Sequence, residues 1–137
     1  MVGAQKLPFG QTHSLRIIGS WSPRLWQTES MSVLESTTIA KITELLVEAA
    51  KPRRIILFGS HARGDAAADS DIDLMVVERG GTDRIAEMVR LRRALLPLDV
   101  GVDLLVVAED HFNYWQHTPG NIYSEAAIEG RVLYEEA

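Results

Sequence analysis

The stretch that decides the fold reads Gly-Ser-His-Ala-Arg-Gly at 59–64 and Ser-Asp-Ile-Asp-Leu at 70–74. The first piece follows a short apolar run at 54–58, and the second opens another apolar run, so each run predicts a buried strand. Side chains alternate between the two faces of a strand, which predicts that Asp71 and Asp73 project on the same face. Adjacent carboxylates repel each other unless a cation lies between them, so the pair indicates a metal site rather than a structural role.

Periodicity along the rest of the chain predicts helices around these strands. Thr82 is the expected N-cap of the helix that follows the second strand, and Pro97 ends that helix. Its expected buried side consists of Ile85, Met88, Val89, Leu91, Leu95 and Leu96. The predicted elements are a helix over 39–49, strands over 54–58 and 71–77, a helix over 82–96, a strand over 102–107 and a helix over 124–129. This order predicts an α/β (α+β) domain, with a small mixed sheet flanked by helices.

Length and composition fit one globular domain. The 137 residues include no cysteine, which excludes disulfides, thiolate metal sites and cysteine nucleophiles and is compatible with the cytoplasm. The net charge of -5 argues against stable nucleic-acid binding, which needs a basic surface. No apolar run approaches the roughly 18 residues that cross a bilayer, so no membrane contact is expected. Residues 1–30 lack a sustained period and are expected to form a poorly ordered extension before a folded domain over 31–137.

A third carboxylate, Asp103, interrupts the apolar run of the third strand. Its neighbours Val102 and Leu104 would be buried on one face, which sends Asp103 to the other. An acid in the middle of a strand is costly unless it is solvated, paired or bound to metal. If its strand lies beside that of the other two aspartates, the three carboxylates can hold two cations about 3.5–4 Å apart, as in phosphoryl displacement.

The Gly-Ser pair at 59–60 is suited to phosphate. Glycine lets the backbone approach a ligand closely, and the hydroxyl and amide of Ser60 can donate to phosphate oxygens. Arg63 adds a forked donor for phosphate or for a nearby aspartate. Each piece alone is common as a turn, a solvated strand end or a surface arginine, whereas the combination is not.

The spacing of these pieces carries a resemblance. Gly59-Ser60, the ten residues 61–70 and Asp-x-Asp form the pattern of the DNA polymerase β-like nucleotidyltransferase superfamily, and the chain resembles that superfamily from about 35 to 107. Its brevity resembles the minimal nucleotidyltransferases (MNT), among them the antitoxins of HEPN/MNT toxin–antitoxin pairs. The resemblance implies the polymerase β-like fold and Mg²⁺-dependent transfer of a nucleoside monophosphate from a triphosphate. The fuller version of the motif also matches at Ala62, Arg63, Gly64 and Ser70.

The resemblance also implies roles for individual residues. The implied catalytic residues, which are also the implied ligands of a two-ion Mg²⁺ site, are Asp71, Asp73 and Asp103. The implied nucleotide-binding residues are Gly59, Ser60, Arg63 and Ser70. The implied donor is ATP, and the implied acceptor is a tyrosine of a partner HEPN RNase toxin.

Two other functions are compatible with the sequence. The domain could neutralise its partner by occlusion without catalysis, or it could modify a small molecule such as an aminoglycoside, for which an oligomer would have to complete the pocket. Further side chains are interpreted structurally: His61 as a solvent-facing turn residue, and the arginines at 90, 92 and 93 as a solvated helix face. The aromatic group Phe112, Tyr114 and Trp115 is expected to pack across the sheet edge.

Overall fold

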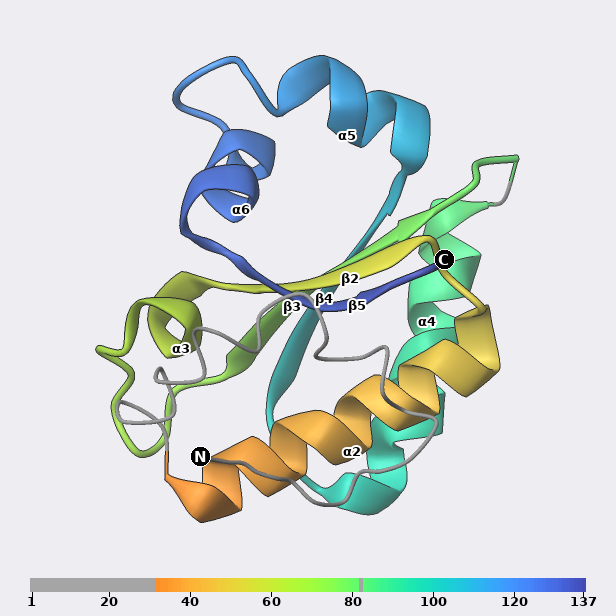
Figure 1. The fold of residues 1–137 in the computed structure, drawn as a ribbon. Helices are drawn as coiled ribbons and strands as arrows, with labels where there is room; N and C mark the ends of the chain where they lie inside the picture. Colours follow the sequence, from red (N-terminus) through yellow and green to blue (C-terminus); the bar gives the residue numbers. More distant parts are fainter. Residues whose placement is uncertain (1–31, 82) are drawn as a thin grey trace.

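One mixed sheet with helices on both faces forms the centre of the fold (Figure 1). The computed structural model describes residues 32–81 and 83–137, so the extension expected over 1–30 lies outside the described residues. The strands lie in the order β4-β3-β2-β5; β3 and β4 are parallel, and β2 is antiparallel to both β3 and β5. Their bounds are Arg54–Phe58 (β2), Ile72–Glu78 (β3), Val102–Ala108 (β4) and Arg131–Glu135 (β5). The predicted mixed sheet is confirmed.

The helices form two layers, one on each face of the sheet. Their bounds are Val33–Ala50 (α2), Gly59–Arg63 (α3), Arg84–Leu95 (α4), Glu109–Trp115 (α5) and Ile122–Glu129 (α6), with a 3-10 turn η3 at Leu96–Leu98. Helices α2 and α4 cover one face, where Ile42, Leu46 and Leu91 join the core. Helices α5 and α6 cover the other face, where Phe112 packs among strand residues. No helix within 32–81 or 83–137 is both long and apolar enough to cross a membrane.

Local chemistry explains where the long helices begin. A capping box opens α2: the Glu35 amide donates to Ser32 Oγ (3.0 Å), and the Ser32 amide donates to Glu35 Oε1 (3.3 Å). Helix α4 is capped by Asp83, whose Oδ1 accepts from two amides of the first turn. The prediction that Thr82 would be the cap is therefore wrong by one residue, because the adjacent carboxylate takes that role.

The structure corrects two further expectations. On α4, Leu91 and Leu95 are buried, whereas Ile85 and Val89 are 72% and 46% exposed, and Leu96, which begins η3, is 72% exposed. A helix that lies on the sheet buries only the stripe that faces it, so the apolar side predicted from the sequence was too wide. The apolar stretch at 132–134, which was not predicted as a strand, belongs to β5.

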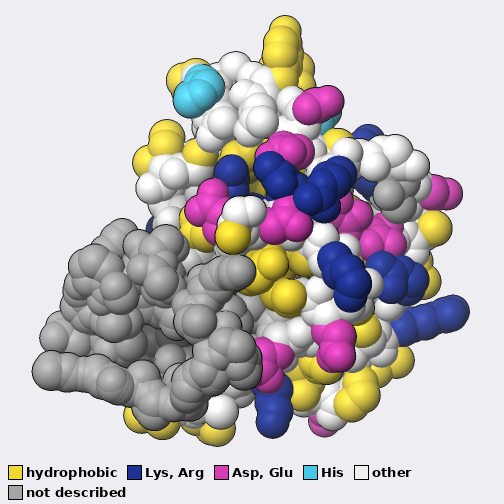
Figure 2. Space-filling view, turned by 45° about the vertical axis from the view of Figure 1, so that its right-hand side comes forward, with side chains coloured by type: hydrophobic (Ala, Val, Ile, Leu, Met, Phe, Trp, Pro, Cys, Tyr) yellow, Lys and Arg dark blue, Asp and Glu magenta, His cyan; other side chains and the backbone are white. Residues whose placement is uncertain are grey.

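Charged side chains on the surface form mixed networks. The Arg53 guanidinium contacts both Glu109 (Nε–Oε1 3.2 Å) and Glu136 (Nη1–Oε1 2.7 Å). Figure 2 shows Lys and Arg side chains interspersed with Asp and Glu over the described part of the face it presents. That face therefore lacks, among its described residues, the continuous basic surface on which nucleic-acid binding depends.

Candidate nucleotidyl-transfer site

The site begins where β2 passes into α3. Gly59, the first residue of α3, is buried and has a φ of +72°, a conformation that residues with a Cβ rarely adopt. A Cβ placed there would lie 3.0 Å from Cγ of Asp73 and closer still to its carboxylate oxygen. Both the backbone conformation and the close approach therefore require glycine at this position.

The sheet brings the predicted aspartates to one end. Parallel pairing places Asp73 opposite Asp103, and antiparallel pairing places Phe58 on the other side of Asp73. The strand that follows Asp71 and contains Asp73 is thus the neighbour of the strand that contains Asp103, and the three carboxylates could converge only if these two strands were neighbours. Asp71 directly precedes β3, and its carboxylate lies against Gly101, where an added Cβ would be 3.2 Å from Asp71 Cγ.

The three carboxylates differ in their surroundings. Asp71 and Asp103 are exposed, whereas Asp73 is half-buried. Burial raises the pKa of Asp73, and the charges of Asp103 and Asp71 raise it further, while His61 opposes the shift. Asp103 Oδ1 also lies 3.7 Å from Arg92 Nη2, so that arginine is engaged with the site as well as with solvent.

The donor chemistry fits a hard divalent cation. Within 32–81 and 83–137, no three or more His, Cys, Asp or Glu side chains are grouped so that they could hold a metal ion as they stand. The aspartates nevertheless offer only oxygen atoms, and two of them are open to solvent, which leaves positions for water and phosphate. Gly59 leaves space that a Cβ would fill, so the Asp73 carboxylate can lie directly against the backbone there. The donor type of these residues fits Mg²⁺.

Arg63 and Ser70 lie at the ends of the loop between α3 and β3. Arg63 Nε donates to Asp65 (3.2 Å), and its Nη1 lies 3.7 Å from Glu125 and 3.6 Å from Glu129 on α6. The arginine therefore links α3 to α6. Ser70 Oγ accepts from the amide of Ala67 (2.9 Å) and shapes the turn before Asp71.

The interpretation of His61 as a solvent-facing residue is wrong. Its side chain is 9% exposed, with Nδ1 bonded to the Glu35 carboxylate and Nε2 3.1 Å from the Ser70 carbonyl oxygen. Two further residues that the sequence did not single out contact the predicted site residues: Glu35 bonds to His61, and Gly101 lies against Asp71. A local signal existed for both, because Glu35 occupies the Glu position of a Ser-x-x-Glu capping box and Gly101 directly precedes a strand.

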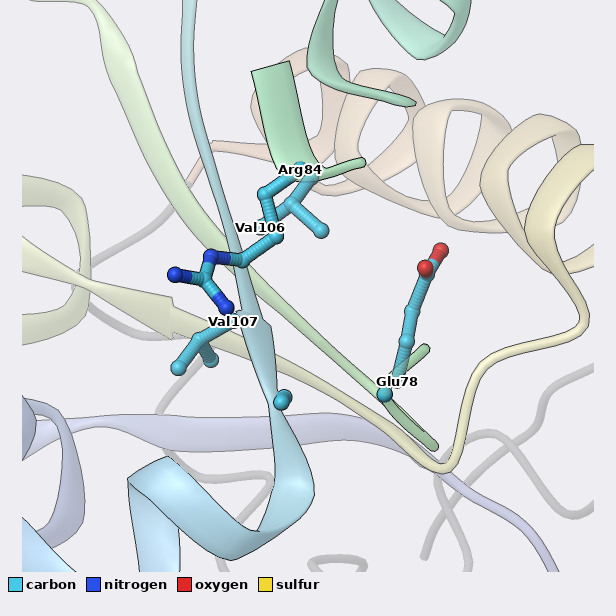
Figure 3. Close-up of a pocket in the computed structure, with 6 residues that line it drawn as sticks. Glu78, Arg84, Val106 and Val107 are labelled. Atoms are coloured by element: carbon cyan, nitrogen blue, oxygen red, sulfur yellow. The ribbon is translucent and has the colours of Figure 1, made fainter. Parts of the chain in front are cut away.

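A second cluster of acids, at the far end of β3, does not resemble a ligand site. Glu78 is 8% exposed; burial raises its pKa to about 7, helped by Glu87 and opposed by Arg90. The cavity beside it holds only about 10 Å³, room for one water. Figure 3 shows the Glu78 and Arg84 side chains pointing in different directions rather than converging on a ligand.

The chain is similar to known proteins over most of its described residues. The family model "Polymerase beta, Nucleotidyltransferase" matches residues 40–137. A curated protein of Methanocaldococcus jannaschii, named as a protein adenylyltransferase, is 35% identical over 82 residues, which cover 60% of this chain and 78% of that protein. A crystal structure of a toxin–antitoxin with AMP-PNP contains a chain that is 27% identical, with a TM-score of 0.51 and coverage of 70% of this chain and 72% of that one. A structure from Sulfolobus solfataricus, named as a nucleotidyltransferase, shares the fold at 20% identity, with a TM-score of 0.54 and coverage of 73% and 79%.

Proposed function

Because the chain belongs to the polymerase beta nucleotidyltransferase family, we propose that it transfers AMP from ATP to a hydroxyl group of a partner protein. One observation carries the proposal: the Asp73 carboxylate lies against Gly59 at the start of α3 and shares a register position with Asp103. This arrangement supports the proposal because it puts two carboxylates beside the backbone that would receive the phosphates. Phosphoryl transfer needs little else from a protein than positioning and charge neutralisation.

Three aspartates would hold Mg²⁺ in this proposal. Asp71 and Asp73 are its ligands and also orient the triphosphate, and Asp103 completes the set from the neighbouring strand. Bound Mg²⁺ would neutralise charge that develops on the transferred phosphoryl group. Like charges at close range also destabilise the free site: burial is the main reason why the pKa of Asp73 is raised, and the charges of Asp103 and Asp71 raise it further.

The nucleotide-binding set surrounds the start of α3. The first amides of a helix have no partner within it, so the backbone at Gly59 and Ser60 can donate to phosphate oxygens, together with the Ser60 hydroxyl. Ser70 holds the turn that delivers Asp71. Arg63 is 41% exposed, and its guanidinium can exchange an acidic partner for phosphate.

Asp103 is the residue that would activate the acceptor hydroxyl. This residue is exposed and lies on β4, at one edge of the sheet, where a macromolecule can reach it. Its carboxylate would accept the hydroxyl proton while the acceptor oxygen bonds to the α-phosphorus. The bond from that phosphorus to the bridging oxygen then breaks, and pyrophosphate leaves.

We propose a toxin of the HEPN class as the partner, a toxin tyrosine as the acceptor and the cytoplasm as the location. Support comes from the relative named as a protein adenylyltransferase and from the toxin–antitoxin relative with AMP-PNP. The acidic charge of the chain also suits a basic, RNA-cleaving partner.

Labelled ATP tests the proposal directly. The purified protein with Mg²⁺ and [α-³²P]ATP should label its co-expressed partner. D73N should reduce the initial rate about 100-fold or more, because a ligand of the metal and triphosphate is lost. D69N removes the same charge from an exposed position on the adjoining loop and should keep the wild-type rate. If D73N protects cells from the toxin as well as wild type does, neutralisation occurs by occlusion and the catalytic proposal is wrong.

A further inference from the structure

The largely buried side chain of His61 connects three parts of the fold: α3, α2 and the loop before β3. Its ring belongs to α3, its Nδ1 is bonded to Glu35 in the first turn of α2, and its Nε2 lies 3.1 Å from the Ser70 carbonyl oxygen. The side chain is 9% exposed and the Glu35 side chain is 24% exposed, so water has little access to the pair. The contact to Ser70 ends one residue before Asp71.

Helix α2 provides a firm anchor for this connection. Glu35 uses Oε1 to accept from the Ser32 amide and Oε2 to bind His61, so one carboxylate caps the helix and holds the ring. Further along the same helix, Ile42 and Leu46 are completely buried in the core. The position of the ring is therefore fixed by an element that packs along the sheet.

The loop that the ring holds has few other supports. Between α3 and β3, the side chains of Asp65, Ala67, Ala68 and Asp69 are exposed. The Ser70 amide donates to the Ala67 carbonyl (3.1 Å), a bond within the loop itself. Exposed loop residues contribute little packing, so the bond from His61 to the Ser70 carbonyl fastens the loop to the body of the domain.

The chemistry of the ring suits a clamp. Its two nitrogens lie on opposite sides of the ring, so a single side chain contacts the Glu35 carboxylate and the Ser70 carbonyl oxygen at the same time. A hydrogen bond to a carboxylate is shorter and stronger than one between neutral groups, and low solvent access strengthens it further.

We propose that His61 and Glu35 form a positioning pair that fixes the Ser70 carbonyl and thereby aims the Asp71 carboxylate at the Mg²⁺–triphosphate group. The inference rests on the proposed function for the role of Asp71, but the clamp itself is a property of the fold. The pair touches the loop and not the reacting atoms, so it acts by placing a ligand. Loss of such a support from a metal ligand typically weakens metal binding or activity about 10–100-fold.

Two variants and a control test the inference. H61F keeps a ring of similar size without hydrogen bonds. E35Q keeps one acceptor oxygen and replaces the other with an amide NH2, so it can accept from the Ser32 amide or from the ring but not from both. S32A removes the hydroxyl that caps α2 but keeps the backbone amide from which Glu35 accepts, so it reports the effect of stability while both bonds of the Glu35 carboxylate remain available. The readouts are the Mg²⁺ concentration for half-maximal AMP transfer and the hydrogen exchange of amides 64–71.

We expect H61F to raise the half-maximal Mg²⁺ concentration about 10-fold or more and to speed exchange across 64–71, with E35Q closer to wild type and S32A unchanged in both. Equal Mg²⁺ dependence and equal exchange in H61F and S32A would overturn the inference. If the wild-type protein transfers no AMP, the proposed function fails, and the exchange of 64–71 in H61F still decides whether the clamp exists.

Discussion

The substitution G59A separates the geometry of the site from the stability of the fold. Alanine at a φ of +72° costs about 1–2 kcal/mol of stability, because a Cβ is disfavoured in the left-handed region. The new Cβ would also lie 3.0 Å from Asp73 Cγ, where ordinary contacts begin at 3.4 Å, and nearer still to the carboxylate oxygen. The carboxylate must therefore move, and a shift of about 1 Å in a positioned group can cost about 100-fold in rate.

The matched control is G120A. Gly120 has a φ of +90° but nothing within 4 Å of an added Cβ, so this variant carries the backbone strain without the collision. Both variants should unfold at lower temperature, by some 4–8 °C per kcal/mol lost, while only G59A should lose AMP transfer at saturating ATP and Mg²⁺. If G59A transfers AMP as fast as G120A, then Asp73 does not need the position that the glycine allows, and the reasoning about this site is refuted.

Three other substitutions probe the core, the acid pair and the second close glycine. F112A should lose about 3–5 kcal/mol in urea unfolding, because the ring is 1% exposed, whereas Y114A on the same helix, 74% exposed, should lose less than about 1 kcal/mol. The folded state binds the Glu78 proton more tightly (pKa about 7 against 4.5), so stability should fall as pH rises from about 4.5 through 7. E78Q should abolish that fall and be more stable than wild type at pH 8, by about 1–3 kcal/mol, but not at pH 4. G101A places a Cβ 3.2 Å from Asp71 Cγ and should raise the Mg²⁺ requirement for AMP transfer with little change in melting temperature.

The sequence was most informative where the pattern is local. Alternation along 71–77 predicted that Asp71 and Asp73 share a face, and the register of β3 with β4 adds Asp103 beside them. The cap of α4 was missed by one residue because Thr82 and Asp83 both favour that role, and propensity does not rank neighbours reliably. Strand β5 was missed because its partner is β2, more than 70 residues earlier, and pairing over that distance leaves no local signature.

The same distinction applies to the site. Gly59, Asp71 and Asp73 stand in a short motif, and the family resemblance that this motif carries is what implied nucleotide chemistry. The role of His61 depends on a carboxylate 26 residues away, so no window around the motif could show that the ring is buried. Arg92 likewise meets Asp103 only once α4 has packed on the sheet.

Strand β3 has a carboxyl group with a raised pKa near each end, Asp73 and Glu78. Access to solvent decides which of the two ends could bind a ligand. At one end, the charged form of Asp73 is destabilised by burial and by two neighbouring acids that are themselves exposed to solvent, which is what the proposed binding of metal and phosphate requires. At the other end the buried Glu87, which raises the pKa of Glu78 further, is already paired with Arg90, and the adjoining cavity admits about one water. Between them, residues 74–77 are at most 1% exposed, which makes the strand a rigid support for the aspartates. An acid with a raised pKa therefore indicates a ligand site only where it is accompanied by neighbouring acids that are exposed to solvent. On that argument E78Q, which changes the stability of the protein, should leave its Mg²⁺ requirement at the wild-type value.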